Sequence, residues 1–251
     1  MEIIDPYKVE PTINPESQEH LEGTQLHRRV LSPMRGGPRS IDIGYNTFKA
    51  GLDVARPYAY SKDEFCYLVK GEFIATSRGD TVTMGAGGFM WRPPRAATER
   101  VRITKDSVSI CAFGPAREDG WSHRLTSEEI DRLSTEELVN PRPIFYSNTL
   151  LIAPPWTNIT GTIEFRRAIS SPRMDVSRAA VSKDSSFRAV LDLRDEVWWL
   201  DSGKLTIVAD GVSHVVLAGQ FITWRSDENA IVSSDEDSVL VIFSAPATEG
   251  D

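Results

Sequence analysis

Short runs of apolar residues, separated by glycine turns, recur along the chain. In one stretch the runs 65–69, 73–76 and 81–84 are divided by Gly71 and Gly79. Short runs rich in aromatic and β-branched residues, at such spacing, are typical of the strands of a β-sandwich or barrel. The pattern has no regular alternation of strands with helices, so a parallel sheet is not expected. It predicts an all-β fold.

The same pattern returns later in the chain, in the runs 197–200, 205–208 and 214–217. Alignment of the segment that starts at Asp63 with the segment that starts at Asp195 brings identical residues into register. The identical pairs are Asp63/Asp195, Glu64/Glu196, Gly71/Gly203, Gly79/Gly211, Gly87/Gly219 and Phe89/Phe221, followed after a one-residue gap by Asp106/Asp237, Ser107/Ser238, Val108/Val239, Pro115/Pro246 and Ala116/Ala247. The matched glycines lie at turns, where a positive φ is cheap only for glycine. The repeat predicts two copies of one barrel in tandem.

One good helical pattern lies between the two copies, in residues 126–141. Thr126 with Glu129, and Ser134 with Glu137, have the spacing of a capping box. Prolines follow and end the pattern. We therefore expect two short helices that join the barrels.

The chain is predicted to divide into an N-terminal arm (1–40), a first barrel (41–118), a helical linker (119–150) and a second barrel (151–251). The arm is polar and rich in proline and glycine, and one strand is expected near Gln25–Leu31. Such an arm would cover a sheet edge, which otherwise invites aggregation.

Composition and charge exclude several classes of function. The chain has 251 residues and a formal net charge of −8, and its length suits two domains of roughly 100 residues each. The acidic balance and the scattered basic residues exclude a nucleic-acid footprint. No apolar run approaches the ~18 residues of a membrane span, and the N-terminus has no signal-peptide pattern. The two cysteines, Cys66 and Cys111, do not make a disulfide framework. We expect a cytoplasmic monomer or homodimer that binds a small molecule, with no nucleic-acid or membrane partner.

Two motifs resemble those of the cupin superfamily. Glu64 and Gly71 form the Glu-x6-Gly element of the family's first motif, which recurs as Glu196 and Gly203. The stretch 87–94, GGFMWRPP, is similar to the second motif. The stretch 91–103, WRPPRAATERVRI, with DSVSICAF (106–113) beyond it, resembles the ethanolamine-utilisation type of cupin, whose members often depart from the usual metal ligands. The resemblance covers about 63–116 and 195–247. It implies a bicupin, in which two cupin barrels (double-stranded β-helix, or jelly-roll) stand in tandem with a short helical linker.

The histidines that most cupins use as metal ligands are missing at the matching positions. Tyr58 and Tyr60 flank the place where the resemblance expects two of them, and Thr98 stands where it expects another. In the second copy that position is Asn229 or Ala230. We therefore predict no cofactor. A divalent metal held by glutamate, tyrosine and water is the weaker alternative, because such a site would be oxygen-rich and loose.

The four histidines of the chain form no H-x-H or H-x-x-x-H pair; they are His20, His27, His123 and His214. A lone histidine of this kind is usually structural or on the surface. One from the arm could instead fold over the mouth of the first barrel.

Three residues of the first barrel are candidate catalytic groups: Glu64, Tyr58 and Tyr60. The resemblance implies that Glu64 points into the barrel, where burial would raise the pKa of a lone carboxyl and suit it to acid or base work. Tyr58 and Tyr60 share one strand face and could donate hydrogen bonds to a developing anion. The alternatives are a glutamate that bonds a turn and tyrosines that pack at the barrel mouth.

Four more residues of the first barrel are candidate substrate contacts: Cys66, Trp91, Arg92 and Thr98. Cys66 shares the face of Glu64, but a buried cysteine is more often a small apolar filler. Arg92 could pair with Glu64 or clamp a substrate carboxylate, and otherwise lies on the barrel surface.

In the second barrel, Glu196 and Trp198 share the inward face and are further substrate-binding candidates, whereas Trp199 points outward and could fill the interface between the barrels. We favour the first barrel as the working copy because its polar groups are more varied.

Three functions remain open. The favoured one is an enzyme of the lyase, isomerase, hydrolase or cyclase type that acts on a small molecule by metal-independent acid/base chemistry. The second is a metal-dependent bicupin enzyme of the aminohydrolase or dioxygenase type. The third is a bicupin that binds a small molecule without catalysis. The fold alone cannot choose among them.

Overall fold

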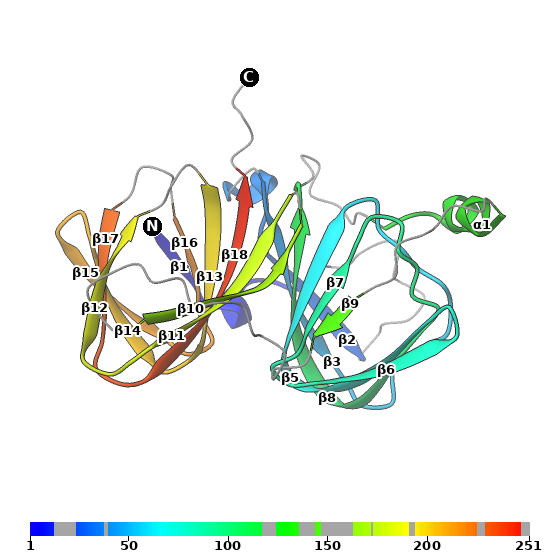
Figure 1. Ribbon diagram of the computed structural model, residues 1–251, viewed down its shortest axis with the longest axis horizontal. Helices are drawn as coiled ribbons and strands as arrows, with labels where there is room; N and C mark the ends of the chain where they lie inside the picture. The colour runs from blue at the N-terminus through cyan, green and yellow to red at the C-terminus, as the bar shows by residue number, and fades with distance from the viewer. Residues whose placement is uncertain are drawn as a thin grey trace, which may run out of the picture.

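The computed structural model describes residues 1–12, 24–37, 40–116, 124–135, 144–146, 163–171, 173–190, 194–224 and 229–246. Strands dominate these residues, as the sequence predicted, and one α-helix is found among them. Figure 1 shows two separate β-structures side by side, with the helix at the far end of the first.

Barrel 1 is built on one sheet, in which the strand order is β2-β3-β8-β5-β7-β9. Its longest strands, β5 (Asp63–Ser77) and β8 (Arg100–Gly114), pair with each other. Register shifts interrupt this pairing near Lys70 and Glu72, and such bulges bend strands and curl a sheet. The shorter strands are β2 (Gln25–Leu31), β3 (Asp42–Phe48), β4 (Asp53–Val54), β6 (Asp80–Gly85), β7 (Phe89–Arg92) and β9 (Ile144–Tyr146).

Barrel 2 consists of two sheets with the orders β1-β16-β13-β18-β11-β10 and β12-β17-β14-β15. Its strands are β1 (Glu2–Ile4), β10 (Ile163–Ser170), β11 (Asp175–Val181), β12 (Ser185–Val190), β13 (Arg194–Ser202), β14 (Lys204–Ala209), β15 (Val212–Leu217), β16 (Phe221–Thr223), β17 (Asn229–Ser234) and β18 (Ser238–Pro246). A core that includes Phe187, Trp198 and Trp224 fills the space between the two sheets.

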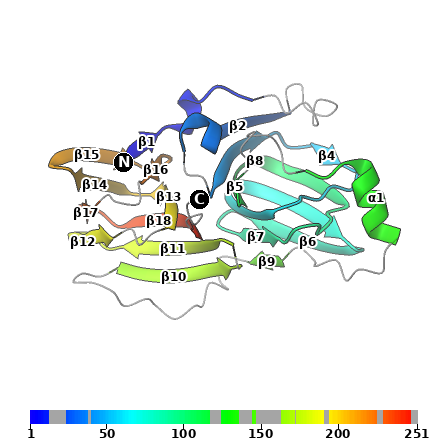
Figure 2. The same ribbon diagram turned by 90° about the horizontal axis from the view of Figure 1, so that it is seen from above.

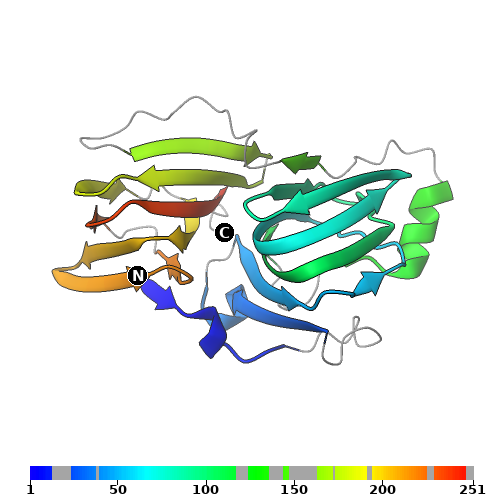
Figure 3. The ribbon, with the colours of Figure 1, turned by 90° about the horizontal axis from the view of Figure 1, so that it is seen from below.

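The N-terminal segment contributes a strand to each barrel. β1 pairs with β16 of barrel 2, and β2 pairs with β3 at the edge of the barrel 1 sheet. In Figure 2 the segment that follows β1 runs from barrel 2 towards barrel 1, where the Thr12 backbone N–H donates to the His27 carbonyl at 2.7 Å. The view from below in Figure 3 shows the same course. The strand predicted at Gln25–Leu31 is β2, whereas β1 was not predicted. The boundaries expected at 40, 118 and 150 stay predictions.

A shared hydrophobic cluster joins the barrels. It combines side chains of barrel 1, such as Tyr45 and Tyr67, with side chains of barrel 2, such as Trp199 and Phe221. The Trp199 ring lies 5.8 Å from the Tyr45 ring and 4.7 Å from the Phe221 ring, measured between centroids. Trp199 therefore fills the interface, as strand alternation predicted.

The helix α1 (Ser127–Thr135) lies beyond barrel 1. Its capping box is present: the Glu129 backbone N–H donates to Thr126 Oγ1 at 3.2 Å, and the Thr126 backbone N–H donates to Glu129 Oε2 at 2.8 Å. The second helix, expected after Ser134, lies outside the described residues. Within the part of the chain that the structure describes, no helix has the length and apolar character needed to cross a membrane.

The repeated residues make matching contacts in the two barrels. In barrel 1, Ser107 Oγ accepts a hydrogen bond from the Glu72 backbone N–H at 3.1 Å. In barrel 2, Ser238 Oγ accepts one from the Lys204 backbone N–H, also at 3.1 Å. In each case the acceptor serine lies next to a turn glycine, which explains why glycine and serine recur together in the alignment.

These two glycines have no room for a side chain. Gly71 has a φ of +93° and Gly203 a φ of +85°. A Cβ at Gly71 would overlap Ser107 Oγ, and a Cβ at Gly203 would overlap Ser238 Oγ. Both positions therefore need glycine for two reasons, the left-handed backbone and the close approach of the neighbouring strand.

Gly71→Ala and Gly203→Ala are each expected to lower the free energy of unfolding by roughly 2–4 kcal/mol, because backbone strain and steric overlap add. Gly79→Ala is the matched control: it also has a positive φ, of +78°, but nothing lies within 4 Å of its Cβ position, so only roughly 1 kcal/mol is expected. Urea unfolding measures all three. Equal losses of unfolding free energy in Gly71→Ala and Gly79→Ala would contradict the close approach of Ser107 to Gly71.

Candidate functional site

A cavity of about 210 Å³ lies inside barrel 1. Side chains from β2, β3, β5, β7 and β8 line it, and much of its wall is apolar, including Phe73, Met90 and Ile103. An apolar cavity of ~150 Å³ is large enough to bind benzene. The cavity of barrel 1 is therefore large enough for a small organic molecule.

Strand alternation decides which residues reach this cavity. On β5, Glu64 and Cys66 face it, and on β7, Met90 and Arg92 face it. β5 and β7 are neighbours in the sheet, and Glu64 lies directly opposite Arg92 in their pairing. Side chains that are directly opposite on one face of a sheet lie close enough to interact. The fold thus brings the carboxylate and the guanidinium together.

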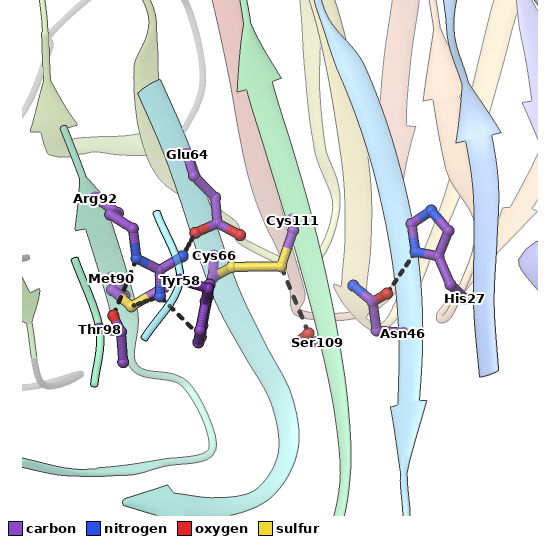
Figure 4. Close-up of a disulfide and its surroundings, with 10 residues drawn as sticks. All are labelled: His27, Asn46, Tyr58, Glu64, Cys66, Met90, Arg92, Thr98, Ser109 and Cys111. Atoms are coloured by element: carbon purple, nitrogen blue, oxygen red, sulfur yellow. Dashed lines mark hydrogen bonds and ion pairs between the residues drawn. A yellow bond between two sulfur atoms is a disulfide. The ribbon is translucent and has the colours of Figure 1, made fainter. Parts of the chain in front are cut away.

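Arg92 is the centre of a buried polar cluster (Figure 4). Its Nη1 forms an ion pair with Glu64 Oε2. Its Nε donates to Thr98 Oγ1 at 3.2 Å, and its Nη2 donates to the Tyr58 hydroxyl at 3.1 Å and to Met90 Sδ at 3.6 Å. Arg92 is 1% exposed and Glu64 3%. Partners on several sides hold the guanidinium in one place.

The carboxylate of Glu64 differs from the lone carboxyl that the sequence suggested. It is buried, as predicted, but it lies against the positive charge of Arg92, which is one of the two roles expected for that arginine. An opposite charge at contact distance favours the ionised form of a carboxyl, whereas burial alone would favour the neutral form. The contact with Arg92 thus gives the carboxylate of Glu64, the form that acts as a base, a counter-charge in the cavity wall.

The two tyrosines lie over the guanidinium. Arg92 Cζ is 4.7 Å from the centre of the Tyr58 ring and 5.3 Å from that of the Tyr60 ring. Both rings line the cavity. Burial raises the pKa of the Tyr60 hydroxyl, and the nearby Tyr58 raises it further, although Arg92 acts in the opposite direction. Tyr60 therefore stays protonated near neutral pH and can donate a hydrogen bond.

Cys66 and Cys111 form a disulfide in the cavity wall. Cys66 is predicted as a substrate contact or a small apolar filler, and its position in the cavity wall agrees with either, but its bond to Cys111 was not predicted. The two cysteines are direct partners in the pairing of β5 with β8, and their Cα atoms are 4.3 Å apart. The disulfide lies beside the carboxylate of Glu64 in Figure 4.

The opposite side of the cavity carries a polar pair that the sequence reasoning did not identify. His27 Nδ1 lies 2.6 Å from Asn46 Oδ1. His27 comes from the arm strand β2, so the arm does reach the barrel. A Cβ on Gly44 would lie 2.5 Å from His27 Cε1. A glycine in the middle of a strand next to the arm is the one signal that could have suggested this close approach.

The charged side chains that line the cavity are mostly basic. Among the described residues they are Arg29, Arg92 and Arg124, against one carboxylate, Glu64. Arg29 Nε also forms an ion pair with Asp42 Oδ1 at 3.1 Å, and Arg124 Cζ lies 5.3 Å from the Tyr58 ring centre. Arg29 and Arg92 are thus both paired with carboxylates, and the guanidinium groups give this wall several N–H donors of the kind that bind carboxylates.

Trp91 does not line this cavity, contrary to its prediction as a substrate contact. It lies between Met90 and Arg92 on β7 and so points to the other face of the sheet. There its ring stacks on Phe65, and its Nε1 donates to Asp63 Oδ1 at 2.9 Å. Thr98 is buried but contributes as the acceptor of Arg92 Nε rather than as part of the cavity wall.

In barrel 2 the matching glutamate is bonded to its neighbours. Trp198 Nε1 donates to Glu196 Oε2 at 2.8 Å, and Ser244 Oγ donates to Glu196 Oε1 at 3.2 Å. The rings of Trp198 and Trp224 pack with their centres 4.9 Å apart in the interior of this barrel. Glu196 and Trp198 therefore lie together, as predicted, but their contacts are those of a packed core.

Comparison with known proteins shows the fold. No family model and no curated protein matches the chain. Among solved structures, protein YlbA from E. coli matches with a TM-score of 0.70 at 12% identity, covering 99% of this chain and 92% of that one. Oxalate decarboxylase matches with a TM-score of 0.69 at 14% identity, covering 99% of this chain and 78% of that one. The chain therefore has the cupin-type fold of two barrels in tandem.

Another of these matches is Bacillus subtilis oxalate decarboxylase, described with Mn(II) centres, at a TM-score of 0.66 and 13% identity, covering 99% of this chain and 78% of that one. The residues of this chain do not fit such an ion. Mn(II) prefers carboxylate, carbonyl and water ligands. Here Tyr58, Glu64 and Thr98, which stand at or beside the ligand positions that the resemblance implies, all contact the Arg92 guanidinium. An ion among these three would meet that positive charge at close range.

Proposed function

We propose that barrel 1 is the active site of a small-molecule enzyme that moves protons without a metal ion. The observation that carries the proposal is the buried ion pair of Glu64 and Arg92, which opens onto a cavity large enough for a small ligand. A fixed charge pair on a largely apolar wall is a feature of acid/base sites, because proton transfer needs a base in a defined place. The low dielectric of an apolar wall also strengthens the electrostatic interactions that stabilise the charge formed during the reaction.

Each polar side chain has a role in this proposal. The Glu64 carboxylate, held in place by Arg92, takes a proton from the ligand at a position next to a carbonyl. The electron pair moves to the carbonyl oxygen, where the protonated hydroxyl of Tyr60 donates a hydrogen bond to the new anion. Arg92 positions the carboxylate and adds positive charge, and Thr98 and Tyr58 hold Arg92. Return of the proton to another atom completes an isomerisation, and loss of a leaving group completes an elimination.

The lining indicates the class of ligand. The guanidinium groups in the lining can donate hydrogen bonds to a carboxylate, and the apolar side chains favour a short carbon skeleton. We therefore propose a small carboxylic acid with an acidic C–H bond as the substrate class.

Hydrogen–deuterium exchange tests this function without knowledge of the full reaction. Pyruvate, malonate and phenylacetate serve as probes in D₂O with EDTA, and NMR follows loss of the C–H signal. For a probe that binds, the full-length protein is expected to speed exchange roughly 100-fold or more over buffer, as general base catalysis typically does. Glu64→Gln should abolish this rate. Glu72→Gln, on the same strand but paired with Lys105 at the surface, is the matched control and should keep it.

Other outcomes separate the competing functions. A probe whose NMR signals shift or broaden saturably with protein concentration, but whose C–H bond does not exchange, would support a protein that binds the molecule without catalysis. Exchange that EDTA abolishes would support the metal-dependent enzyme and contradict the proposal.

A further inference from the structure

We propose that reduction of the Cys66–Cys111 disulfide creates a binding site for a thiophilic divalent cation, such as Zn²⁺, formed by both thiolates and the Glu64 carboxylate. The site lies in the same cavity wall as the proposed proton-transfer site but belongs to a different redox state. It uses donors that the oxidised protein cannot offer, because a disulfide sulfur is a poor ligand and the thiolate is the metal-binding form.

The geometry brings the three donors together. One ligand atom from each of Glu64, Cys66 and Cys111 lies within 4.8 Å of the others. Ligand atoms around a tetrahedral zinc ion lie roughly 3.5 Å apart, given Zn–S bonds of ~2.3 Å. Breaking the S–S bond frees both sulfurs to rotate about their Cα–Cβ bonds, so side-chain rotation alone could reach this spacing. The strands β5 and β8 keep the two cysteines side by side after reduction, because their backbone pairing continues on both sides of this position.

The electric charges also balance. Two thiolates and one carboxylate carry three negative charges, and Arg92 carries one positive charge next to the carboxylate. Two negative charges remain, and one divalent cation neutralises them. An ion among Tyr58, Glu64 and Thr98 would find only one anionic ligand, which Arg92 already neutralises. In the thiolate site, Arg92 instead acts as an outer partner that orients the ligand carboxylate.

The site is enclosed but has access to the cavity. Cys66 is 5% exposed and Glu64 3%, and both cysteines line the cavity. Ser109 Oγ lies 3.7 Å from Cys111 Sγ, and the fourth position faces the cavity, where a water molecule completes the tetrahedron. Three protein ligands with one open position are typical of zinc sites that keep an exchangeable ligand.

The redox step is balanced by a thiol reductant. The protein disulfide accepts two electrons and two protons from a dithiol such as dithiothreitol, which becomes a cyclic disulfide. Binding of the cation then releases the two thiol protons to solvent. Since the carboxylate now binds the cation, Glu64 no longer accepts protons from a ligand.

Cobalt titration tests the site on the full-length protein. The protein is reduced with dithiothreitol, desalted under nitrogen and titrated with Co²⁺. We expect one equivalent to bind with a sulfur-to-cobalt charge-transfer band, and Zn²⁺ to displace it. The chain has two cysteines, so this band reports on them alone. The oxidised protein should show no band and at least a 100-fold weaker affinity.

Variants identify the ligands. Cys66→Ser and Cys111→Ser should each lose most of the charge-transfer band. Glu64→Gln should weaken Co²⁺ binding by at least roughly 10–100-fold, because removal of an outer-shell partner alone typically has an effect of that size. Glu72→Gln, on the same strand, should change nothing. Circular dichroism confirms that each variant is folded.

The proposal is overturned if the reduced protein gives no charge-transfer band, if oxidised and reduced protein bind Co²⁺ equally, or if dithiothreitol fails to reduce the native disulfide. These results leave the proton-transfer proposal standing, because deuterium exchange is measured on oxidised protein in EDTA.

Discussion

Replacement of Arg92 by methionine is expected to lower the free energy of unfolding by about 3–5 kcal/mol, the loss found when one partner of a buried ion pair is removed. Methionine keeps much of the side-chain volume, so the loss reports on charge rather than on a cavity. The physical reason is that Glu64, 3% exposed, would be left without its counter-charge. Urea unfolding at neutral pH measures the change.

Two controls make this result specific. Arg100→Met removes an ion pair with Asp53 at the surface, and exposed pairs of this kind contribute little to stability because water screens both charges. The double variant Arg92→Met/Glu64→Gln should recover much of the stability, because it leaves no buried charge. A loss at Arg92 no larger than the loss at Arg100 would contradict the buried pair.

Trp199→Ala is expected to destabilise the protein by about 3–5 kcal/mol, as large-to-small changes of buried tryptophan do. Trp199 is 2% exposed and contacts side chains from both barrels. We therefore expect a lower midpoint temperature of thermal unfolding. We also expect a loss of cooperativity, seen in calorimetry as two separate transitions for the two barrels.

Val215→Ala, on the exposed side of β15, is the control for this experiment. Its side chain is 54% exposed, and surface changes of this kind usually stay within about 0.5 kcal/mol. If Trp199→Ala kept a single sharp transition at an unchanged midpoint, the shared cluster would not be what couples the barrels.

Much of the candidate site follows from local pattern. Alternation along β5 is enough to place Glu64 and Cys66 on one face, and the structure agrees. The same rule applied to β7 separates Trp91 from Arg92, and it conflicts with the prediction of both as substrate contacts. The sequence therefore holds the information that places Trp91 on the other face, because side chains alternate with a period of two along a strand.

Other parts of the site depend on which strands become neighbours. Cys66 and Cys111 are 45 positions apart in the chain, and only the register of β5 with β8 places them opposite each other. His27 reaches the cavity because β2 pairs with β3 and because Gly44 leaves room for the ring. Neither contact has a local signature of its own, apart from the glycine.

The amino-acid sequence by itself determined the all-β class, the two barrels in tandem and the glycines that their turns require. These features arise from interactions between residues close in the chain: strand alternation, turn conformation and helix capping. Only the tertiary structure decided that Arg92 lies against Glu64, that the cysteines are bonded and that the N-terminal segment contributes a strand to each barrel. Those features depend on pairing between distant strands, and a shift of one residue in that pairing would turn every side chain to the opposite face.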